Sequence, residues 1–329
     1  MTVFISVVVI AHDRREFIMD ALKSVFAQTL DRNRYEVIVV KNFIDETIDE
    51  YIRKMNGENI VTTEVSAGSK VLIGINASRG NVISLLSDDD LYLTQKLRRI
   101  YNIFESEVNL SYYHNAFATI DHFGHTKNFR RYKTNGIKML ISNDKVNMGD
   151  LSIMVKNLGY HNDSCISFRK EAYLDYMYAL NDLKVSWDSF LFFLSFRGKN
   201  QIMIDSEILT YFRVHDSMSQ TFGNYTTFIN KRNILASDYI DETTLTIDLA
   251  ENVAVKEYLL YIATTWKIVS AFTGSSSTKN ITFTDFAIIL KNIKYSIPAG
   301  RFFTIIGLMS VLLPRYFSSR LYYVYNLCR

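Results

Sequence analysis

The sequence is poor in the residues that interrupt a fold or cross-link it. It has only two prolines and thirteen glycines in 329 residues, which argues against low-complexity linkers. Its two cysteines, Cys165 and Cys328, offer no disulfide framework, and this suits a reducing compartment. Hydrophobic residues make up 48% of the chain. The length therefore corresponds to roughly two domains, or to one α/β domain with an appendage, built on a substantial core.

The N-terminus lacks the features of an export signal. The apolar run from residue 3 to 11 is followed by His12, Asp13 and two arginines, without a charged segment before it or a small-residue cleavage site after it. We therefore expect no signal peptide and interpret this run as a first strand.

Acidic residues are missing from the end of the chain, where none follows Asp285 while six basic residues do. Within this tail, Phe302–Leu313 is an uncharged apolar segment, shorter than the roughly 20 residues that span a bilayer. Flanking arginines and later tyrosines favour an interfacial anchor on an anionic membrane surface, to which each basic residue contributes about 1 kcal/mol. The alternative is a buried helical hairpin that covers the preceding domain or forms a homodimer.

Strands and helices are predicted to alternate along the first ninety residues. β-Branched runs predict strands at 4–10, 35–40, 60–65 and 82–86, and apolar residues at helical spacing predict helices at 14–29 and 47–55, with a loop entering a helix at 68–78. This alternation indicates a parallel, doubly wound sheet with right-handed crossovers.

Later elements follow from the same patterns. We expect helices at 91–104, 170–180, 189–196, 253–272 and 283–293, strands at 109–119, 165–168, 202–204 and 208–214, and a polar surface segment with a basic cluster at 121–147.

Three consecutive acids, Asp88, Asp89 and Asp90, follow the run Val82–Leu86. That run has the composition of a strand buried on both faces. Ligands gather beyond the carboxyl ends of strands in open α/β sheets, and adjacent carboxylates repel unless they are solvated or share a hard cation such as Mg²⁺ or Mn²⁺. The alternative is a solvated turn that caps a helix beginning near Leu91.

Three histidines, His114, His122 and His125, lie within twelve residues. Their spacing matches no zinc site, so we expect loop or substrate contacts instead.

Several motifs, in order, resemble the glycosyltransferases of family 2. The run Gly74–Asp90 resembles the family pattern G-x-N-x-A-x-G-x-x-I-x-F-L-D-x-D-D, and Thr94–Leu97 stands in the place of P-x-K-L. Ser24 and Gln28 match an S-x-x-x-Q pattern, and Tyr211–His215 with Ser219 is similar to Y-R-x-H-x-x-x-S. The resemblance covers about residues 3 to 220.

The resemblance implies an α/β fold of the GT-A (Rossmann-like) type, a mainly parallel sheet flanked by helices with a C-terminal helical extension. Residues 1–110 would form the nucleotide-sugar-binding half, 111–222 the acceptor-binding half, and 223–329 a membrane-associated helical region.

The resemblance also assigns residues to the donor and the cation. Asp89, Asp90 and His215 are expected at the metal, while Ser87 replaces the usual first acid and leaves the ribose partner open. The residues expected at the donor are Ala11, His12, Asp13, Arg14, Asn42, Lys70, Asp88 and Asp89.

Asp188 falls where the family keeps its catalytic carboxylate. A base near the acceptor hydroxyl is what an inverting transfer needs, and the alternative role, an N-cap for the following helix, is compatible with it. Trp187 replaces the family's usual acid before this base; it is expected to stack on an acceptor sugar or to pack in the interior.

Two departures put the donor's identity in doubt. Where the family commonly has Asp-Asp-Gly-Ser, this chain has Lys41-Asn42-Phe43-Ile44-Asp45; Asn42 or Asp45 is the candidate for the base contact and Lys41 for phosphate. The family's Arg-Asn pair is absent after Lys70, which either supplies the lost charge or is an ordinary surface lysine.

The leading hypothesis is a metal-dependent, inverting glycosyltransferase that uses Mg²⁺ or Mn²⁺, a nucleotide-sugar donor, and a glycan or lipid-linked acceptor. It would be cytoplasmic, peripheral at the inner face of the cell membrane, with no nucleic-acid partner. The alternative is a non-catalytic, nucleotide-binding, membrane-associated scaffold. A dinucleotide-dependent oxidoreductase is disfavoured because G-x-G-x-x-G is missing after the first strand.

Overall fold

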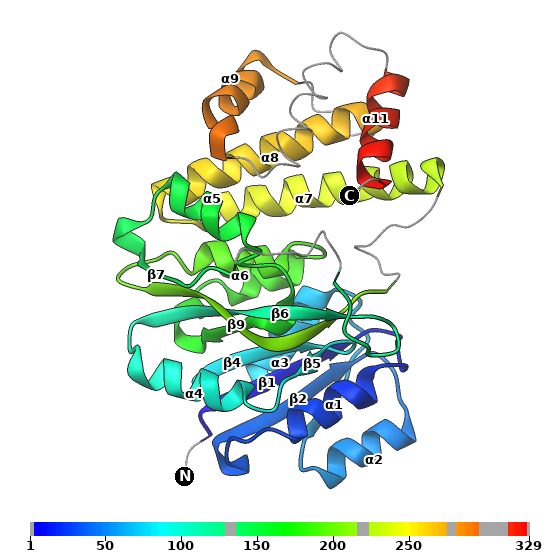
Figure 1. Ribbon diagram of the computed structural model, residues 1–329, viewed down its shortest axis with the longest axis vertical. Helices are drawn as coiled ribbons and strands as arrows, with labels where there is room; N and C mark the ends of the chain where they lie inside the picture. The colour runs from blue at the N-terminus through cyan, green and yellow to red at the C-terminus, as the bar shows by residue number, and fades with distance from the viewer. Residues whose placement is uncertain (1–2, 129–135, 216–223, 275–280, 296–314, 328–329) are drawn as a thin grey trace. The chain divides into compact units, whose positions relative to one another are not determined.

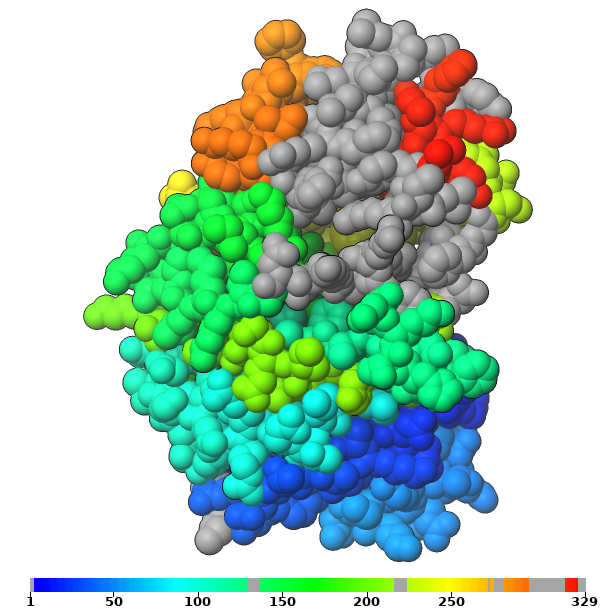
Figure 2. Space-filling view, in the orientation of Figure 1, coloured from blue at the N-terminus to red at the C-terminus, as the bar shows by residue number. Residues whose placement is uncertain are grey.

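The computed structural model describes residues 3–128, 136–215, 224–274, 281–295 and 315–327, which are coloured in Figures 1 and 2. Contacts divide the chain into two compact units, residues 1–145 with 157–214, and residues 146–156 with 215–329. Several predictions concern residues outside the described ranges. They are the predicted membrane anchor Phe302–Leu313, the basic residues Arg130, Arg131 and Lys133, and Ser219.

The first four strands form a parallel sheet in the order β3-β2-β1-β4 (Figure 1). They are β1 (Ile5–Ala11), β2 (Tyr35–Lys41), β3 (Glu58–Val61) and β4 (Val82–Ser87). The helices α1 (Ile18–Phe26), α2 (Glu46–Lys54) and α3 (Ala67–Ala77) connect them. The predicted alternation is confirmed, and α3 begins already where a loop was expected.

The remaining strands make the sheet mixed rather than wholly parallel. After β4 the order is β8 (Ile166–Arg169), β6 (Leu110–Ile120), β9 (Gln201–Arg213) and β5 (Leu91–Tyr92), and β7 (Met139–Ser142) also pairs with β9. β8 runs antiparallel to both β4 and β6, while β6 and β9 are parallel. The sheet is therefore mixed and mostly parallel by the length of its paired segments.

Four predicted elements of this half are wrong in detail. The helix expected at 91–104 is β5 followed by α4 (Lys96–Ser106), because Leu91 and Tyr92 pair with β9. The helix expected at 170–180 is two 3₁₀ segments, η5 (Lys170–Tyr173) and η6 (Met177–Asp182). The two strands expected near 202 and 208 are the single strand β9, which stays continuous through register shifts against β6.

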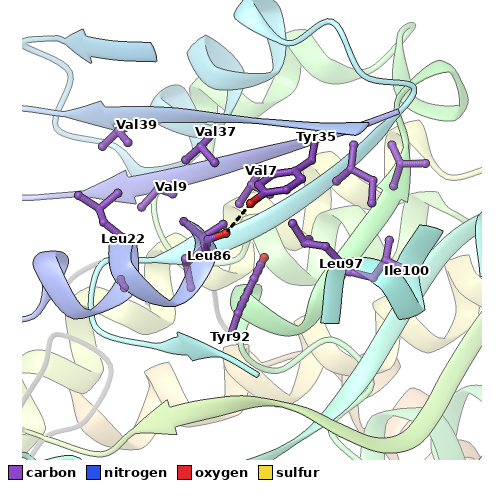
Figure 3. Close-up of a cluster of buried hydrophobic side chains, with 14 of the residues drawn as sticks. Val7, Val9, Leu22, Tyr35, Val37, Val39, Leu86, Tyr92, Leu97 and Ile100 are labelled. Carbon is purple, nitrogen blue, oxygen red and sulfur yellow. Dashed lines mark hydrogen bonds between the residues drawn. The ribbon is translucent and has the colours of Figure 1, made fainter. Parts of the chain in front are cut away.

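The core of the first unit lies between this sheet and its helices. Figure 3 shows Val7 and Val9 of β1 beside Val37 and Val39 of β2, with Leu22 of α1 on the same side. Alternate residues of a strand share a face, so the valines form a continuous apolar surface. Fully burying one such side chain stabilises the folded state by about 1.5–3 kcal/mol. The core therefore holds the strands, and with them the segments that follow their ends, in place.

Gly68 allows α3 to pack closely on the segment around η6. A Cβ at this position would lie 2.2 Å from the backbone oxygen of Leu180 and 2.7 Å from that of Leu183. We expect Gly68→Ala to lower the free energy of unfolding by about 1–3 kcal/mol, because backbone atoms must move. The matched control is Gly149→Ala, whose Cβ would meet only the side-chain oxygen of Asn147 at 3.0 Å. Urea unfolding that shows equal losses for both variants would contradict the tight contact.

The second unit is helical. Its helices are α5 (Met148–Lys156), α7 (Tyr225–Leu249), α8 (Val253–Thr273), α9 (Phe283–Asn292) and α11 (Arg315–Leu327). The predicted helices at 253–272 and 283–293 are confirmed, and Tyr239 and Trp266 stack between α7 and α8 with ring centroids 4.3 Å apart. Among the helices that the structure describes, none is both long and apolar enough to cross a membrane.

Candidate functional site

Three parallel strands end side by side and bring most of the predicted donor residues together. In the register of the sheet, Ala11 pairs with Lys41, and Ile10 pairs with Ser87. The segments that follow β1, β2 and β4 therefore leave the same edge of the sheet. Ala11 itself is buried in β1, so its position can offer only backbone groups to a ligand.

Arg14 links the first of these segments to the acids after β4. Its Nε donates to Asp88 Oδ1 at 3.1 Å, and its second guanidinium nitrogen lies 2.9 Å from Asp89 Oδ2. Burial raises the pKa of Asp88 to about 6, and Arg14 opposes that rise. The other oxygen of Asp88, Oδ2, is buried and has no hydrogen-bond partner. An unpaired buried carboxylate oxygen is costly, so this atom is suited to a cation or a donor group of a ligand.

A second set of contacts joins the segments after β1 and β2. The backbone N–H of Asp13 donates to Asn42 Oδ1 and the Asn42 amide donates to Asp13 Oδ1, both at 2.8 Å. His12 lies between Asp13, whose Oδ2 is 3.3 Å from His12 Nε2, and the amine of Lys70, which contacts His12 Nδ1. Lys70 is only 1% exposed, and burial lowers the pKa of its amine. It is therefore not an ordinary surface lysine.

Lys41 and Asp45 have structural roles that the sequence pattern did not indicate. Lys41 is fully buried, with Nζ 2.8 Å from Asp49 Oδ1 and donating to the backbone oxygen of Phe43 at 2.5 Å. The predicted phosphate contact is wrong for this arrangement, since the amine is already paired inside the protein. Asp45 is the N-cap of α2 and accepts from the N–H of Ile48 at 3.2 Å. Asn42 is thus the residue of this segment that joins the group at the strand ends.

Asp90 is buried and bonded to β9. It is 1% exposed, and its Oδ1 accepts from the N–H of Arg213 at 2.9 Å, while Arg213 Nε donates to the backbone oxygen of Asp89 at 2.8 Å. Burial and the charge of Asp89 raise its pKa well above the ordinary value. Asp90 therefore fastens the end of β4 to β9, and its metal-binding role remains a prediction.

The predicted metal ligands Asp89, Asp90 and His215 stay a prediction. Within the described ranges, no three His, Cys, Asp or Glu side chains are grouped so that they could hold a metal ion. His215 belongs to the second unit, so its expected role stays a prediction. His114 is buried, with Nε2 2.9 Å from the backbone oxygen of His161, and burial lowers its pKa to about 3. His122 instead pairs with Glu16 at 3.1 Å.

Asp188 occupies the first turn of α6 (Trp187–Leu194), two positions after the N-cap that it was expected to be. Ser186 is the N-cap of this helix, and Asp188 Oδ1 accepts from the N–H of Ser189 at 2.7 Å. The negative charge of Asp188 adds to burial in raising the pKa of Tyr160. Trp187 is 7% exposed and packs in the interior. The roles of Asp188 as base and Trp187 as acceptor contact remain predictions.

Sequence reasoning missed a segment that is hydrogen-bonded to the end of β4. The 3₁₀ helix η4 (Asp163–Cys165) places the Asp163 carboxylate against Ser87, whose Oγ donates to Asp163 Oδ2 at 2.7 Å. Lys96 lies beneath it, fully buried, and donates to the backbone oxygen of Ser164 and to Thr210 Oγ1. Burial lowers the pKa of this lysine to about 7. No motif marks Asp163; its position next to the strand at 165–168 was the only available signal.

The pKa of Asp163 makes the stability of the chain depend on pH. Burial raises this pKa from 3.8 to about 6, so the folded state binds more protons than the unfolded state between about pH 4 and 6. Stability contributed by this group therefore falls as pH rises through that window. The free energy of unfolding of Asp163→Asn, relative to that of the unaltered chain, should rise between about pH 4 and 6. Above about pH 6 the difference between the two proteins should stay constant. Urea unfolding of both proteins across this pH range measures the difference. A difference that does not vary with pH would contradict the raised pKa of Asp163.

Comparisons with solved structures show the fold. The structure of S. aureus TarS residues 1–349 matches with a TM-score of 0.57 and 13% identity, covering 99% of this chain and 92% of that one. The same fragment in complex with UDP-GlcNAc gives a TM-score of 0.55 and 14% identity, covering 96% and 88%. Against a longer TarS structure the TM-score is 0.56 at 13% identity, and the chain spans 53% of the length of that relative. The expected GT-A fold is confirmed.

Sequence comparison identifies the family. No curated protein matches the chain. A family model described as glycosyl transferase family 2 matches residues 6–174, which include Arg14, Asp88 and Asp89. The matched segment is more than half of the chain, and the chain belongs to glycosyl transferase family 2.

Proposed function

We propose that this glycosyltransferase transfers a hexose from a nucleotide-sugar donor to an acceptor hydroxyl, with inversion and with the help of a divalent cation. The observation that carries the proposal is the meeting of Asp88, Asp89, Arg14 and Lys70 at one edge of the sheet. Carboxylates and cations side by side suit a metal-bound diphosphate. The TarS fragment solved with UDP-GlcNAc supports a uridine diphosphate sugar as the first donor to test.

The residues at the strand ends fit a bound Mg²⁺ or Mn²⁺. Asp88 offers a buried oxygen without a partner, and Asp89 lies next to it with its Oδ2 held only 2.9 Å from Arg14. Mg²⁺ is commonly bound by one or two carboxylates together with substrate phosphates, which agrees with the absence of a preformed three-residue group among the described residues. Such a cation would neutralise the charge that develops on the departing diphosphate.

The chain's own residues account for the other requirements of the reaction. Arg14 and Lys70 would bind the diphosphate as positive groups, and the Asp13–Asn42 pair would contact the nucleoside. Asp188 would take the proton of the acceptor hydroxyl. The acceptor oxygen then forms its bond to the anomeric carbon as the bond from that carbon to the diphosphate breaks, and the configuration inverts.

The proposal is tested with purified protein, Mn²⁺ and a panel of nucleotide sugars. Binding is measured by calorimetry and donor hydrolysis by release of the nucleoside diphosphate. We expect one donor to bind in a Mn²⁺-dependent manner and to be hydrolysed slowly. If no donor binds and none is hydrolysed, the proposed function is wrong.

The acceptor is proposed from the basic tail. Six basic residues and no acidic ones follow Asp285, which favours contact with an anionic membrane surface and hence a lipid-linked glycan at its cytoplasmic side. We expect the chain to co-sediment with vesicles containing phosphatidylglycerol and to remain in solution with neutral vesicles. Equal partitioning with both would contradict the electrostatic part of this proposal.

A further inference from the structure

The end of β4 is held by a segment that lies far from it in the sequence. The N–H of Ser87 donates to Ser164 Oγ at 3.0 Å, and the hydroxyl of Ser87 donates to Asp163 Oδ2 at 2.7 Å. The backbone N–H and the hydroxyl of Ser87 are thus both bonded to η4. As a result, a carboxylate from η4 stands at the point where β4 itself ends in a hydroxyl.

The local backbone keeps Asp163 in this place. Asn162, which precedes it, has a positive φ of 71°, and its side chain accepts from the N–H of Ser164 at 3.0 Å. The backbone oxygen of Ser164 accepts from Lys96 and, at 3.1 Å, from Thr210 Oγ1. A non-glycine residue with positive φ is uncommon and persists where its surroundings require it. The carboxylate is therefore carried by a rigid support.

Asp163 belongs to the same electrostatic group as Asp88 and Asp89. The negative charge of Asp89 raises the pKa of Asp163, and the positive charge of Arg14 lowers it. A further observation points to a ligand here: the side chain of Asp88 is only 3% exposed, and beyond the contacts of its carboxylate with Arg14 and the backbone of His12, its Oδ2 makes no hydrogen bond of ordinary geometry within the protein. Asp88, Asp89 and Asp163 therefore lie within electrostatic reach of one another, and a divalent ion would reduce the repulsion among these carboxylates.

We propose that Asp163 is a donor-binding residue, which supplies from η4 the carboxylate that β4 lacks at Ser87 and acts with Asp89 on the cation-bound diphosphate. The inference rests on the proposed function and deepens it, because it assigns part of that site to a residue outside the motif. A purely structural role is the competing explanation. In that case any side chain that accepts the hydrogen bond from Ser87 would serve equally well.

The test measures the affinity of UDP and of GDP at fixed Mn²⁺ concentration by calorimetry. Asp163→Asn keeps the shape and a hydrogen-bond acceptor but removes the charge, and it should weaken nucleotide binding about 10–100-fold, as loss of a supporting ligand does. Asp175→Asn, at an exposed position of the same unit, is the matched control and should bind as the unaltered chain does. Thermal unfolding of each variant establishes that it is folded.

Moving the carboxylate from position 163 to position 87 distinguishes a ligand-binding role of Asp163 from a purely structural one. Asp163→Ser alone should bind weakly, and the double variant Ser87→Asp/Asp163→Ser, which moves the acid across the same contact, should recover affinity to within about threefold of the unaltered chain. The inference is overturned if Asp163→Asn binds as tightly as the unaltered chain, or if the double variant binds no better than Asp163→Ser, while Asp89→Asn still weakens binding. If the unaltered chain binds neither nucleotide with Mn²⁺, the proposed function fails, and this inference fails with it.

Discussion

Asp188→Asn should lower kcat by about 10²–10⁴-fold, the usual contribution of a general base, and leave the affinity for the nucleotide donor unchanged. The carboxylate sits in the first turn of α6, where one oxygen accepts from the N–H of Ser189. An amide oxygen can keep that hydrogen bond but cannot accept the proton of an acceptor hydroxyl. The loss should therefore appear in turnover and not in binding, as measured by steady-state transfer and by calorimetry on the same samples.

The same variant separates the enzyme from the scaffold alternative. Asp182→Asn changes an exposed acid of η6 in the same way and should keep full turnover. A scaffold would lose nothing when Asp188 is changed. Turnover within about twofold of the unaltered chain would thus exclude Asp188 as the base.

Asp89→Asn should lower kcat/KM by about 100–1000-fold, because the charge that stabilises a departing diphosphate is a large part of such catalysis. Asp89 lies beside Arg14 at the common edge of the strands, and its replacement removes one negative ligand for the cation. The variant should need a much higher Mn²⁺ concentration for donor binding. A Mn²⁺ titration of nucleotide affinity measures this directly.

Asp90→Asn is the informative comparison for Asp89. Asp90 is buried and accepts from the N–H of Arg213, so its change should alter the midpoint of thermal unfolding more than the Mn²⁺ requirement. If Asp90→Asn shifts the Mn²⁺ requirement as strongly as Asp89→Asn does, the inward orientation of Asp90 is not its functional one. If Asp89→Asn leaves the requirement unchanged, the cation is held elsewhere.

Much of the first half of the fold could be predicted because its parallel strands share one sequence pattern. β1, β2 and β4 are continuous apolar runs, and a parallel strand covered on both faces requires such runs. Because parallel strands end at one edge, the positions of Arg14, Asn42 and Asp88 as neighbours follow from the strand assignments alone. The structure confirms that these segments meet.

The antiparallel part of the sheet could not be predicted in the same way. β8 and β5 are only a few residues long, and short segments depend on their partners more than on their own composition. The neighbour of Ser87 is likewise decided by long-range pairing, because Asp163 lies 76 positions further along the chain. A single sequence offers no local signal for that contact.

Lys41 shows how a charge can mislead when its position alone is considered. A lysine at the end of a strand was expected to meet phosphate, yet its amine pairs with Asp49 of α2 and is completely covered. Lys70, which could have been an ordinary surface residue, is instead buried against His12. Which residues surround each amine depends on the tertiary fold, and the sequence pattern alone does not show them.

The most direct test of the account is a calorimetric titration of UDP-GlcNAc into the unaltered chain and into Asp89→Asn, each with Mn²⁺ and with a chelator. The account predicts binding by the unaltered chain with Mn²⁺, a loss of at least about 10-fold with chelator, and a similar loss in Asp89→Asn even with Mn²⁺. Binding that is equally strong with chelator, and equally strong in Asp89→Asn, would contradict a cation-assisted donor site at the end of β4.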